Sequence, residues 1–273
     1  MIVSAPEVAH HHKAGQFVIV RPTSVAERIP LTIADSDASA GTVTLIYQVV
    51  GKTTGEMSLL QAGSNLTDIA GPLGRPTHVD HFGTVIGIGG GIGIAPLHPI
   101  AKAMKQANNR VISVLGARTK DLLILETEMQ VASTEIRIVT DDGSAGQKGF
   151  VTDALQRLIK EEPKVDLVVA IGPPIMMKFV SELTRPLGIK TLVSLNTIMV
   201  DGTGMCGGCR VSVGNEVKFV CVDGPEFDGH LVDFGEMMKR QNTYKEAEKV
   251  SFAAFQKQHV CHLERMAKEV SHG

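Results

Sequence analysis

The residues best suited to chemistry are three cysteines and an aspartate in the last third of the chain. Their spacing is Asp201-x4-Cys206-x2-Cys209-x11-Cys221. Plant-type 2Fe–2S sites space three cysteines as Cys-x4-Cys-x2-Cys and take a fourth further along the chain. Here the spacing is kept with Asp201 at the first position, and a carboxylate is an anionic ligand that can bind iron through oxygen. The pattern predicts a 2Fe–2S cluster held by these four residues.

Glycines surround the candidate ligands, at Gly202, Gly204, Gly207 and Gly208. A loop around a cluster needs positive φ angles and backbone N–H groups close to sulfur, and glycine allows both. Structural zinc is the alternative, because a tetrahedral zinc site accepts three thiolates and one further ligand. Aspartate before glycine is also common in turns, so a turn role is a second explanation of Asp201.

A second candidate site is the glycine-rich segment GIGGGIGIAP, residues 87–96, which separates an apolar run from a helical pattern. At such a junction the backbone can approach a pyrophosphate, and the helix N-terminus stabilises its charge. The strict G-x-G-x-x-G pattern fails at Ile92, and a tight packing turn is the alternative. Two further loops, Asp141-Asp142-Gly143 and Gly172-Pro173-Pro174, each follow an apolar run. Loops at the carboxyl ends of parallel strands form a ligand crevice, so we predict a nucleotide site there.

Two segments near the N-terminus carry groups that suit a flavin nucleotide. Arg28, in RIPLT, could pair with a diphosphate, and Thr32 could hydrogen-bond a flavin edge. The segment VGKTT, residues 50–54, ends a strand-like run. Taken alone, these are ordinary residues of β-structure, and composition does not identify a flavin.

The elements that must position these residues fall into four predicted parts. Residues 1–80 hold short β-branched runs such as GQFVIVR and TVTLIYQVV, broken by Gly, Pro and Asp, which predict a small antiparallel β-barrel. Residues 81–192 alternate apolar strands with helical patterns, which predicts a parallel-sheet α/β domain. Residues 193–226 are glycine-rich, include the hairpin-like CRVSVGNEVKFVC, and are expected to form the cluster module. Residues 227–273 are charged and helix-prone, and are expected to form a docking tail.

Composition narrows the choice of partner and compartment. The chain has 273 residues, a formal net charge of −2 and 4% aromatic residues with no Trp, which disfavours nucleic acid and anionic membranes as partners. No apolar run approaches the roughly 20 residues that span a bilayer, and no secretory signal is visible. Clustered cysteines in such a chain indicate metal rather than disulfides, and a reducing cytoplasm is expected. The His10–His12 run predicts a solvated turn, and Cys261, forty residues beyond Cys221, is expected to be a bystander.

The motifs resemble those of the ferredoxin–NADP reductase superfamily. RIPLT resembles its Arg-x-Pro-x-Ser/Thr flavin motif, VGKTT its second flavin-contacting loop, GPLG (residues 71–74) the end of its flavin domain, and GGGIGIAP its nucleotide loop. The order of flavin barrel, nucleotide domain and cluster module is similar to the electron-transfer subunit of class 1B dihydroorotate dehydrogenase. Asp201 and the tail FDGHLVDFGEMMKRQNTYKEAEK resemble the small subunit of NADH-dependent ferredoxin:NADP oxidoreductase, a family that includes sulfide dehydrogenase subunits.

The resemblance implies FAD, a 2Fe–2S cluster and NAD(H) as cofactors. The implied FAD contacts are Arg28, Pro30, Leu31, Thr32, Val50, Gly51, Lys52, Thr53 and Thr54. The implied dinucleotide contacts are Gly89, Gly90, Gly91, Ile92, Gly93, Ala117, Arg118, Asp141, Asp142, Gly143, Gly172 and Pro173. The implied cluster ligands are Asp201, Cys206, Cys209 and Cys221. Hydride transfer needs no acid–base residue, and no catalytic residue is predicted.

The resemblance also implies an electron-transfer subunit. Nicotinamide moves electron pairs, an iron–sulfur cluster moves single electrons, and a flavin connects the two. The implied partner is a larger flavin and 4Fe–4S subunit, in which electron bifurcation couples NADH, NADPH and ferredoxin. Three alternatives stay open: an electron-transfer subunit of dihydroorotate dehydrogenase, a non-catalytic zinc- and nucleotide-binding module, and a single-chain diaphorase. Arg118 suits a 2′-phosphate or a diphosphate, so the residues do not decide between NADH and NADPH.

Overall fold

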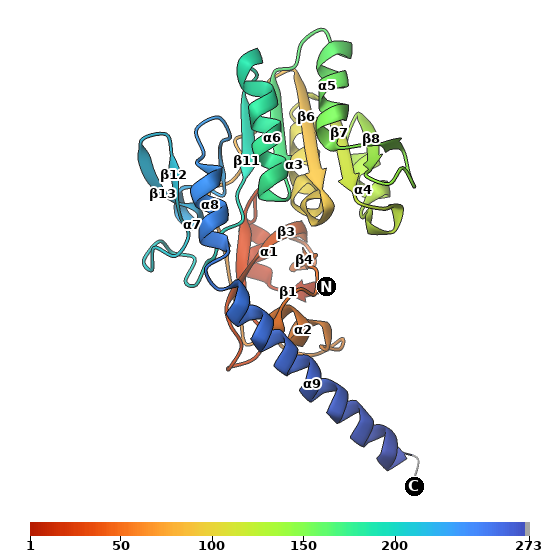
Figure 1. Cartoon of the computed structure of the whole chain (residues 1–273), viewed down its shortest axis with the longest axis vertical. Helices are drawn as coiled ribbons and strands as arrows, with labels where there is room; N and C mark the ends of the chain where they lie inside the picture. The colour runs from red at the N-terminus through yellow and green to blue at the C-terminus, as the bar shows by residue number, and fades with distance from the viewer. Residues whose placement is uncertain (271–273) are drawn as a thin grey trace.

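The computed structural model describes residues 1–270, with side chains described up to residue 258. Two sheets dominate, an antiparallel one built from the N-terminal residues and a larger, mostly parallel one (Figure 1). A two-stranded hairpin and a C-terminal helical segment complete the chain. Among the described helices, none is both long enough and apolar enough to cross a membrane.

The antiparallel sheet has five strands in the order β1-β4-β3-β2-β5. These are β1 (Ile2–Ser4), β2 (Phe17–Arg21), β3 (Ile29–Asp37), β4 (Thr42–Leu45) and β5 (Asp68–Leu73), with the short helices α1 (Pro6–His11) and α2 (Lys52–Ser58). The register shifts once in the β2–β5 pair and once in the β3–β4 pair, and such bulges increase curl. Val18, Val20 and Ile33 pack inside the curl. The predicted barrel is therefore confirmed as a curled, open half-barrel.

Two local predictions in this part are wrong. His10 and His11 belong to helix α1 rather than to a turn, because Pro6 starts the helix and Glu7 follows in its first turn, where a negative charge is favourable. The strand predicted from Thr42 onward ends at Leu45, and the chain beyond it turns toward the second sheet.

The second sheet has seven strands in the order β14-β11-β10-β6-β7-β8-β9. Its strands are β6 (Thr84–Gly90), β7 (Arg110–Ala117), β8 (Glu135–Thr140), β9 (Gln147–Lys148), β10 (Leu167–Ile171), β11 (Thr191–Ser194) and β14 (Glu226–Asp228). All neighbours run parallel except β14, which pairs antiparallel with β11. The predicted strand–helix alternation is confirmed. The sheet also extends past residue 192. Strand β11 pairs with the edge of β10 and ends at Ser194, and β14 then pairs with the outer edge of β11.

Helices cover both faces of this sheet. They are α3 (Ile94–Gln106), α4 (Glu126–Ala132), α5 (Val151–Glu161) and α6 (Pro174–Thr184), with 3₁₀ turns at Gly91–Gly93, Lys120–Leu122 and Arg185–Leu187. Helices α3 and α4 pack on one face around Ile94 and Met104, and α5 and α6 pack on the other around Leu155 and Val180. Strands such as β6 and β10, buried on both faces, are the near-continuous apolar runs seen in the sequence.

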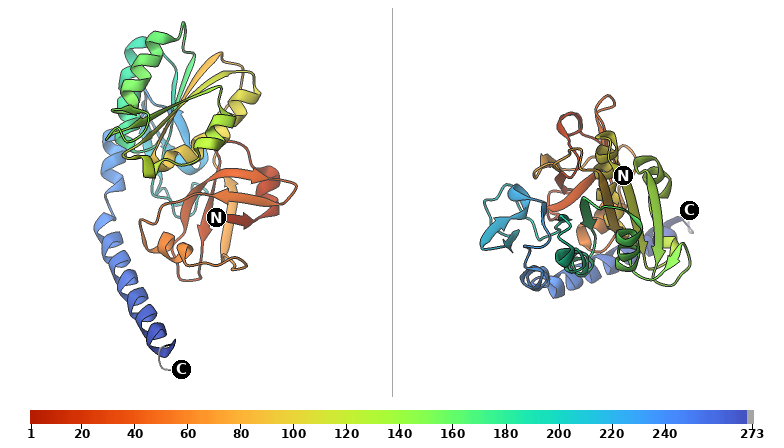
Figure 2. Two further views of the ribbon diagram at one scale, coloured as in Figure 1. Left: turned by 90° about the vertical axis from the view of Figure 1, so that its right-hand side faces the viewer. Right: turned by 90° about the horizontal axis from the view of Figure 1, so that it is seen from above.

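The remaining residues form the tail and the segment that carries the four predicted cluster ligands, residues 201–221, which is called the cluster loop below. A hairpin of β12 (Arg210–Val213) and β13 (Glu216–Phe219) leads into the short helix α7 (Val220–Asp223). Two further helices follow β14, α8 (Phe234–Gln241) and α9 (Lys245–Val270). Figures 1 and 2 show α9 running past the antiparallel sheet and ending away from both sheets. The three domain boundaries at residues 80, 192 and 226 stay predictions, and Cys261 lies outside the described side chains.

Candidate cofactor site

The glycine-rich segment lies where the order of the parallel sheet reverses. The chain moves from β6 to β7 and β8 on one side and then returns to β10 on the other, so the crevice at the carboxyl ends of β6 and β10 is a topological switch point. A Cβ on Gly93 would lie 2.2 Å from the Ile171 oxygen, so this glycine serves close packing. Gly91 has φ +56° and open space beside it. Gly93 therefore fits the packing-turn explanation, and the ligand-loop explanation stays a prediction.

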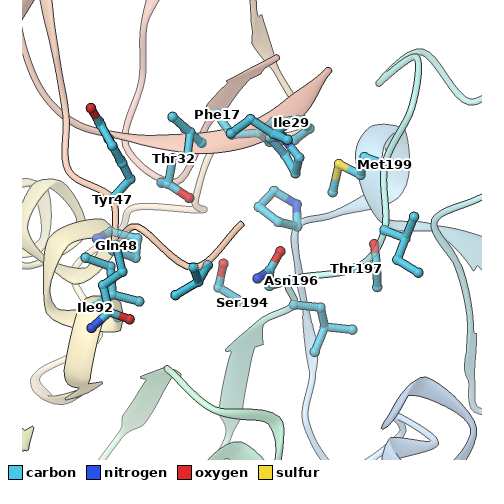
Figure 3. Close-up of a pocket in the computed structure, with 18 of the residues that line it drawn as sticks. Phe17, Ile29, Thr32, Tyr47, Gln48, Ile92, Ser194, Asn196, Thr197 and Met199 are labelled. Carbon is cyan, nitrogen blue, oxygen red and sulfur yellow. The ribbon is translucent and has the colours of Figure 1, made fainter. Parts of the chain in front are cut away.

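A cleft of about 630 Å³ opens at this switch point, between the two sheets. Its walls come from strand β3, the chain after β4, the start of α3, the end of β10, the loop after β11 and the tail. In Figure 3, side chains from these segments surround a common space, with Thr32 and Tyr47 from the half-barrel and Asn196 and Thr197 from the loop after β11. Ligand clefts of small cofactors fall in this size range and lie at domain junctions.

On the half-barrel side, all five residues of the first flavin motif, Arg28 to Thr32, line the cleft. The predicted residues that line it are Arg28, Pro30, Leu31 and Thr32, together with Val50 and Thr54. Arg28 approaches Asp68 at 3.8 Å through Nη1, but its buried Nε has no hydrogen-bond partner among the described residues. The buried Thr197 Oγ1 across the cleft also has none. Buried polar atoms are normally paired, so both atoms fit a bound group with oxygen acceptors, such as the diphosphate and polyol of FAD.

The second flavin segment builds the start of helix α2. The N–H groups of Val50 and Gly51 each donate to Thr54 Oγ1 at 3.1 Å, and this hydroxyl donates to the Gly51 oxygen at 3.0 Å. Lys52 pairs with Glu56 at 3.8 Å. The turn is therefore held by Thr54, and Gly51, Lys52 and Thr53 do not line the cleft.

The predicted dinucleotide residues divide into two groups. Ile92, Gly93 and Gly172 line the cleft, whereas Gly89, Gly90, Gly91, Ala117, Arg118, Asp141, Asp142, Gly143 and Pro173 do not. The second group still lies along the same edge, since Asp141 N–H donates to the Ala117 oxygen at 3.1 Å. The Asp142 carboxylate accepts from the hydroxyl and N–H of Ser144, and the hydroxyl bond is the main cause that lowers its pKa. Asp142 is therefore engaged in its own turn.

Sequence reasoning missed one wall of the cleft. The end of β11 and the loop after it contribute Ser194, Leu195, Asn196, Thr197, Ile198 and Met199. The carboxyl-end rule could have predicted this wall, because the loop also follows the carboxyl end of a parallel strand. Gln241 and Glu248 of the tail line the cleft as well, and no signal in the sequence placed them there.

The cluster loop brings two of the four predicted ligands into contact. The sulfur atoms of Cys209 and Cys221 lie 3.2 Å apart, both buried, whereas Cys206 is exposed. The N–H of Cys221 points at Cys209 Sγ and that of Gly208 at Cys206 Sγ, each at 3.5 Å. Burial, followed by the contact with Cys209, raises the pKa of the Cys221 thiol to about 12. A cation would be needed to hold this pair as thiolates, since coordination to a metal ion deprotonates a thiol.

Asp201 faces the backbone of the same loop. Its carboxylate accepts the N–H of Thr203 at 2.9 Å and the N–H of Cys206 at 2.8 Å, and the Thr203 bond is the first cause that lowers its pKa. In the described part of the chain, no three His, Cys, Asp or Glu side chains converge on one metal position. A 2Fe–2S centre places two protein ligands on each iron. The Cys209–Cys221 pair fits the ligands of one iron, and the ligand role of Asp201 stays a prediction.

The role of Asp201 can be tested by replacing it with cysteine. If Asp201 is a ligand, Asp201→Cys keeps about two irons per chain and changes the midpoint potential, because a thiolate donates more electron density than a carboxylate. Potentiometric titrations of both proteins at several pH values measure this. Equal potentials at every pH would assign Asp201 to the turn alone.

The junction between the two sheets contains a partly buried acid. Glu226 Oε1 accepts a hydrogen bond of 2.6 Å from the Thr77 hydroxyl, and Thr77 lies in the segment that connects the sheets. Burial raises the pKa of Glu226 to about 7. Nearby, the Arg75 N–H donates to the Gly224 oxygen at 2.6 Å. These bonds fix the connecting segment to the chain that follows Cys221.

This acid gives the fold a pH dependence of known sign. A carboxyl whose folded-state pKa lies above its ordinary value of 4.5 stabilises the fold fully below pH 4.5 and loses that contribution as the pH rises through 7. Since part of the Glu226 side chain reaches solvent, we expect the loss to be about 1–2 kcal/mol. Glu226→Gln keeps an acceptor for Thr77 and should be more stable than the native chain at pH 8 by that amount. Urea unfolding at pH 5 and 8 measures it, with the exposed Glu128→Gln as control; equal pH profiles would contradict it.

Comparison with known proteins identifies the parts of the chain. Residues 88–182 match the family model described as oxidoreductase NAD-binding domain, and residues 196–233 match the iron–sulfur cluster binding domain of dihydroorotate dehydrogenase B. The chain is similar to the dihydroorotate dehydrogenase B (NAD(+)) electron transfer subunit homolog of Thermotoga maritima, with 51% identity over 93% of this chain and 90% of that protein. The corresponding subunit of Geobacillus thermodenitrificans is 35% identical over 83% of this chain and 89% of its own length.

A solved structure agrees with these relatives. The structure of an NADH-dependent reduced ferredoxin-NADP oxidoreductase, studied for flavin-based electron bifurcation, superposes with a TM-score of 0.89. The two sequences are 48% identical, over 93% of this chain and 92% of that one. The fold is that of ferredoxin–NADP reductases, and the chain is an oxidoreductase subunit with FAD, a 2Fe–2S cluster and NAD(H) as its cofactors. With these domains in this order and these identities over most of its length, the chain belongs to the family of dihydroorotate dehydrogenase B electron-transfer subunits and their homologues.

Proposed function

We propose that this chain is the small subunit of an NADH-dependent ferredoxin:NADP oxidoreductase and works beside a larger flavin and 4Fe–4S subunit. The observation that carries the proposal is the likeness to the solved oxidoreductase over 93% of the chain, which extends past the two matched domains into the tail. In this reading, electrons from NADH leave the chain through the cluster module, and bifurcation in the complex connects NADH, NADPH and ferredoxin.

The residues of the cleft have distinct proposed roles toward FAD. Arg28 supplies a permanent positive charge for the diphosphate, together with an Nε that has no hydrogen-bond partner in the described part of the chain, while Thr32 and Thr197 supply hydroxyl groups. The Thr54 hydroxyl accepts hydrogen bonds that fix the backbone at the start of α2, and it is not itself a proposed contact of FAD. Bound FAD would supply the exchange between a two-electron hydride and single electrons.

The remaining sites have proposed roles along the same edge and in the cluster loop. Residues 89–93, with Gly172 and Pro173, are the proposed contacts of the dinucleotide, and Gly91 has open space beside it for a close approach of ligand to backbone. The Ala117–Arg118 and Asp141–Gly143 loops would hold its far end. Cys209 and Cys221 are close enough to bind one iron, and Cys206 and Asp201 are the proposed ligands of the other.

Purification of the native assembly tests the proposal. An affinity tag on this chain should retrieve a larger subunit that contains flavin and 4Fe–4S clusters. The assembly should reduce NADP⁺ only when NADH and reduced ferredoxin are supplied together, because bifurcating complexes couple the two donors. Turnover with NADH alone, or a stable and fully active single chain, would contradict the proposal.

A second function is supported by the curated relatives themselves. Several are electron transfer subunits of dihydroorotate dehydrogenase B, at 33–38% identity. If this chain serves that enzyme, the tagged chain would retrieve a dihydroorotate dehydrogenase subunit and the assembly would reduce NAD⁺ with dihydroorotate. The same preparation therefore decides between the two functions.

A further inference from the structure

The tail, which the sequence predicts to be a charged docking segment, reaches the cofactor cleft. Gln241 ends helix α8 and Glu248 lies one turn into α9, and both line the cleft beside the residues of the flavin motif. One wall of the cleft is therefore supplied by a segment that begins after the cluster module has ended.

The first anchor of the tail joins it to two loops at once. Arg240 Nη2 donates to the Gly208 oxygen at 3.2 Å, and Gly208 lies between the predicted ligands Cys206 and Cys209. The neighbouring Gln241 donates through its amide to the Asn196 oxygen, in the loop after β11 that lines the cleft. Two adjacent side chains of α8 thus attach the cluster loop and the cleft loop to the same helical turn.

The second anchor is a ring packed on a glycine. Phe255 of α9 covers Gly55 of α2 so closely that a Cβ on Gly55 would lie 2.6 Å from Cε1 of the ring. Gly55 is buried and directly follows Thr54, which lines the cleft. Phe252 stacks on Phe255 with 6.3 Å between ring centroids. The absence of a side chain at Gly55 is what allows α9 to approach this end of the cleft.

We propose that the tail is a retaining strap of the FAD site, which spans from the cluster loop to helix α2 and holds FAD in the cleft. The proposal rests on the assignment of the cleft to FAD. Gln241 and Glu248 are positioning residues in this account, and Phe255 sets the place where α9 docks. Because coupling between two binding events is reciprocal, FAD should stabilise the docked tail by the same factor by which the tail tightens FAD.

Two point variants displace the strap by opposite routes. Phe255→Ala removes the ring, and Gly55→Ala puts a methyl group where the ring lies. Each is expected to raise the FAD dissociation constant roughly tenfold, within the usual range of coupling between sites. Val250→Ala is the matched control, since it shortens an exposed apolar side chain on the same helix and lines no part of the cleft. Titration of deflavinated protein with FAD, followed by flavin fluorescence, measures all four chains.

Amide hydrogen exchange of the native chain, with and without FAD, tests the same proposal without relying on a variant that must fold. We expect amides of residues 245–258 to exchange faster in the deflavinated chain than in the FAD-loaded chain, with the cluster content equal in both. The strap proposal would be overturned if both variants bound FAD with native affinity, or if the amide exchange rates of α9 were the same with and without FAD. A native chain that binds no FAD at all would instead refute the proposed function, so the two failures are distinguishable.

Discussion

Replacing Cys209 with serine is expected to remove the cluster and leave FAD bound. Cys209 and Cys221 are buried with their sulfur atoms 3.2 Å apart, close enough for both to bind one iron after a small adjustment of the side chains. A serine hydroxyl is a poor replacement for a thiolate, so iron and acid-labile sulfide should fall from about two of each per chain to near zero. Cys221→Ser should behave in the same way, because either change breaks the same pair.

Metal, sulfide and flavin analysis of anaerobically purified protein measures this result. Cys261→Ser is the control, since it makes the same chemical change at a cysteine outside the predicted ligand set. The FAD content should stay at the native level in all three variants, because Cys209 and Cys221 do not line the cleft. Native iron content in Cys209→Ser, or one zinc per chain without sulfide in the native protein, would contradict the cluster assignment.

Replacing Arg28 with alanine is expected to weaken FAD binding by roughly 10- to 100-fold. The change removes a charge-assisted hydrogen-bond donor, and such bonds contribute about 1.5–3 kcal/mol. The buried Nε of Arg28 has no partner among the described residues, so its donor is available to a diphosphate. Arg28→Lys should recover only part of the affinity, because an ammonium group lacks the planar set of donors.

The chain contains a matched control for this prediction. Arg21 forms the closer ion pair with Asp68, 2.6 Å against 3.8 Å for Arg28, but does not line the cleft. Arg21→Ala should therefore disturb the half-barrel at least as much as Arg28→Ala while it leaves FAD affinity unchanged. Equilibrium dialysis against FAD, with thermal unfolding of each variant, separates binding from folding. Equal losses of affinity in both variants would mean that Arg28 acts through Asp68 alone.

Much of the architecture was predictable because it rests on local periodicity. The apolar runs of β6, β7 and β10 and the helical spacing of α3, α5 and α6 indicated the parallel sheet, and the carboxyl-edge rule placed the glycine-rich segment and Gly172 beside the cleft. Cysteine spacing pointed to the contact between Cys209 and Cys221 that the structure shows.

The parts that were not predictable depend on contacts distant in sequence. Strand β14 joins the sheet only because β11 offers a free edge, and the tail reaches the cleft only because α9 packs on α2 through Phe255 and Gly55. Neither the β14–β11 pairing nor the packing of α9 on α2 produces a periodic pattern in the sequence. The histidine run is different, because the helix start at Pro6 and Glu7 is a local signal, and the turn predicted for His10–His12 from their place before a strand-like segment was wrong for His10 and His11.

Transfer of electrons from NADH to the cluster of this chain can be observed in a single experiment. Anaerobic protein with FAD and cluster bound should be mixed with NADH and frozen for electron paramagnetic resonance. We expect bleaching of the flavin absorbance together with the signal of a reduced 2Fe–2S cluster, and Cys209→Ser should show the bleaching without that signal. Fully loaded protein in which NADH reduces neither cofactor would rule out electron transfer from NADH through this chain.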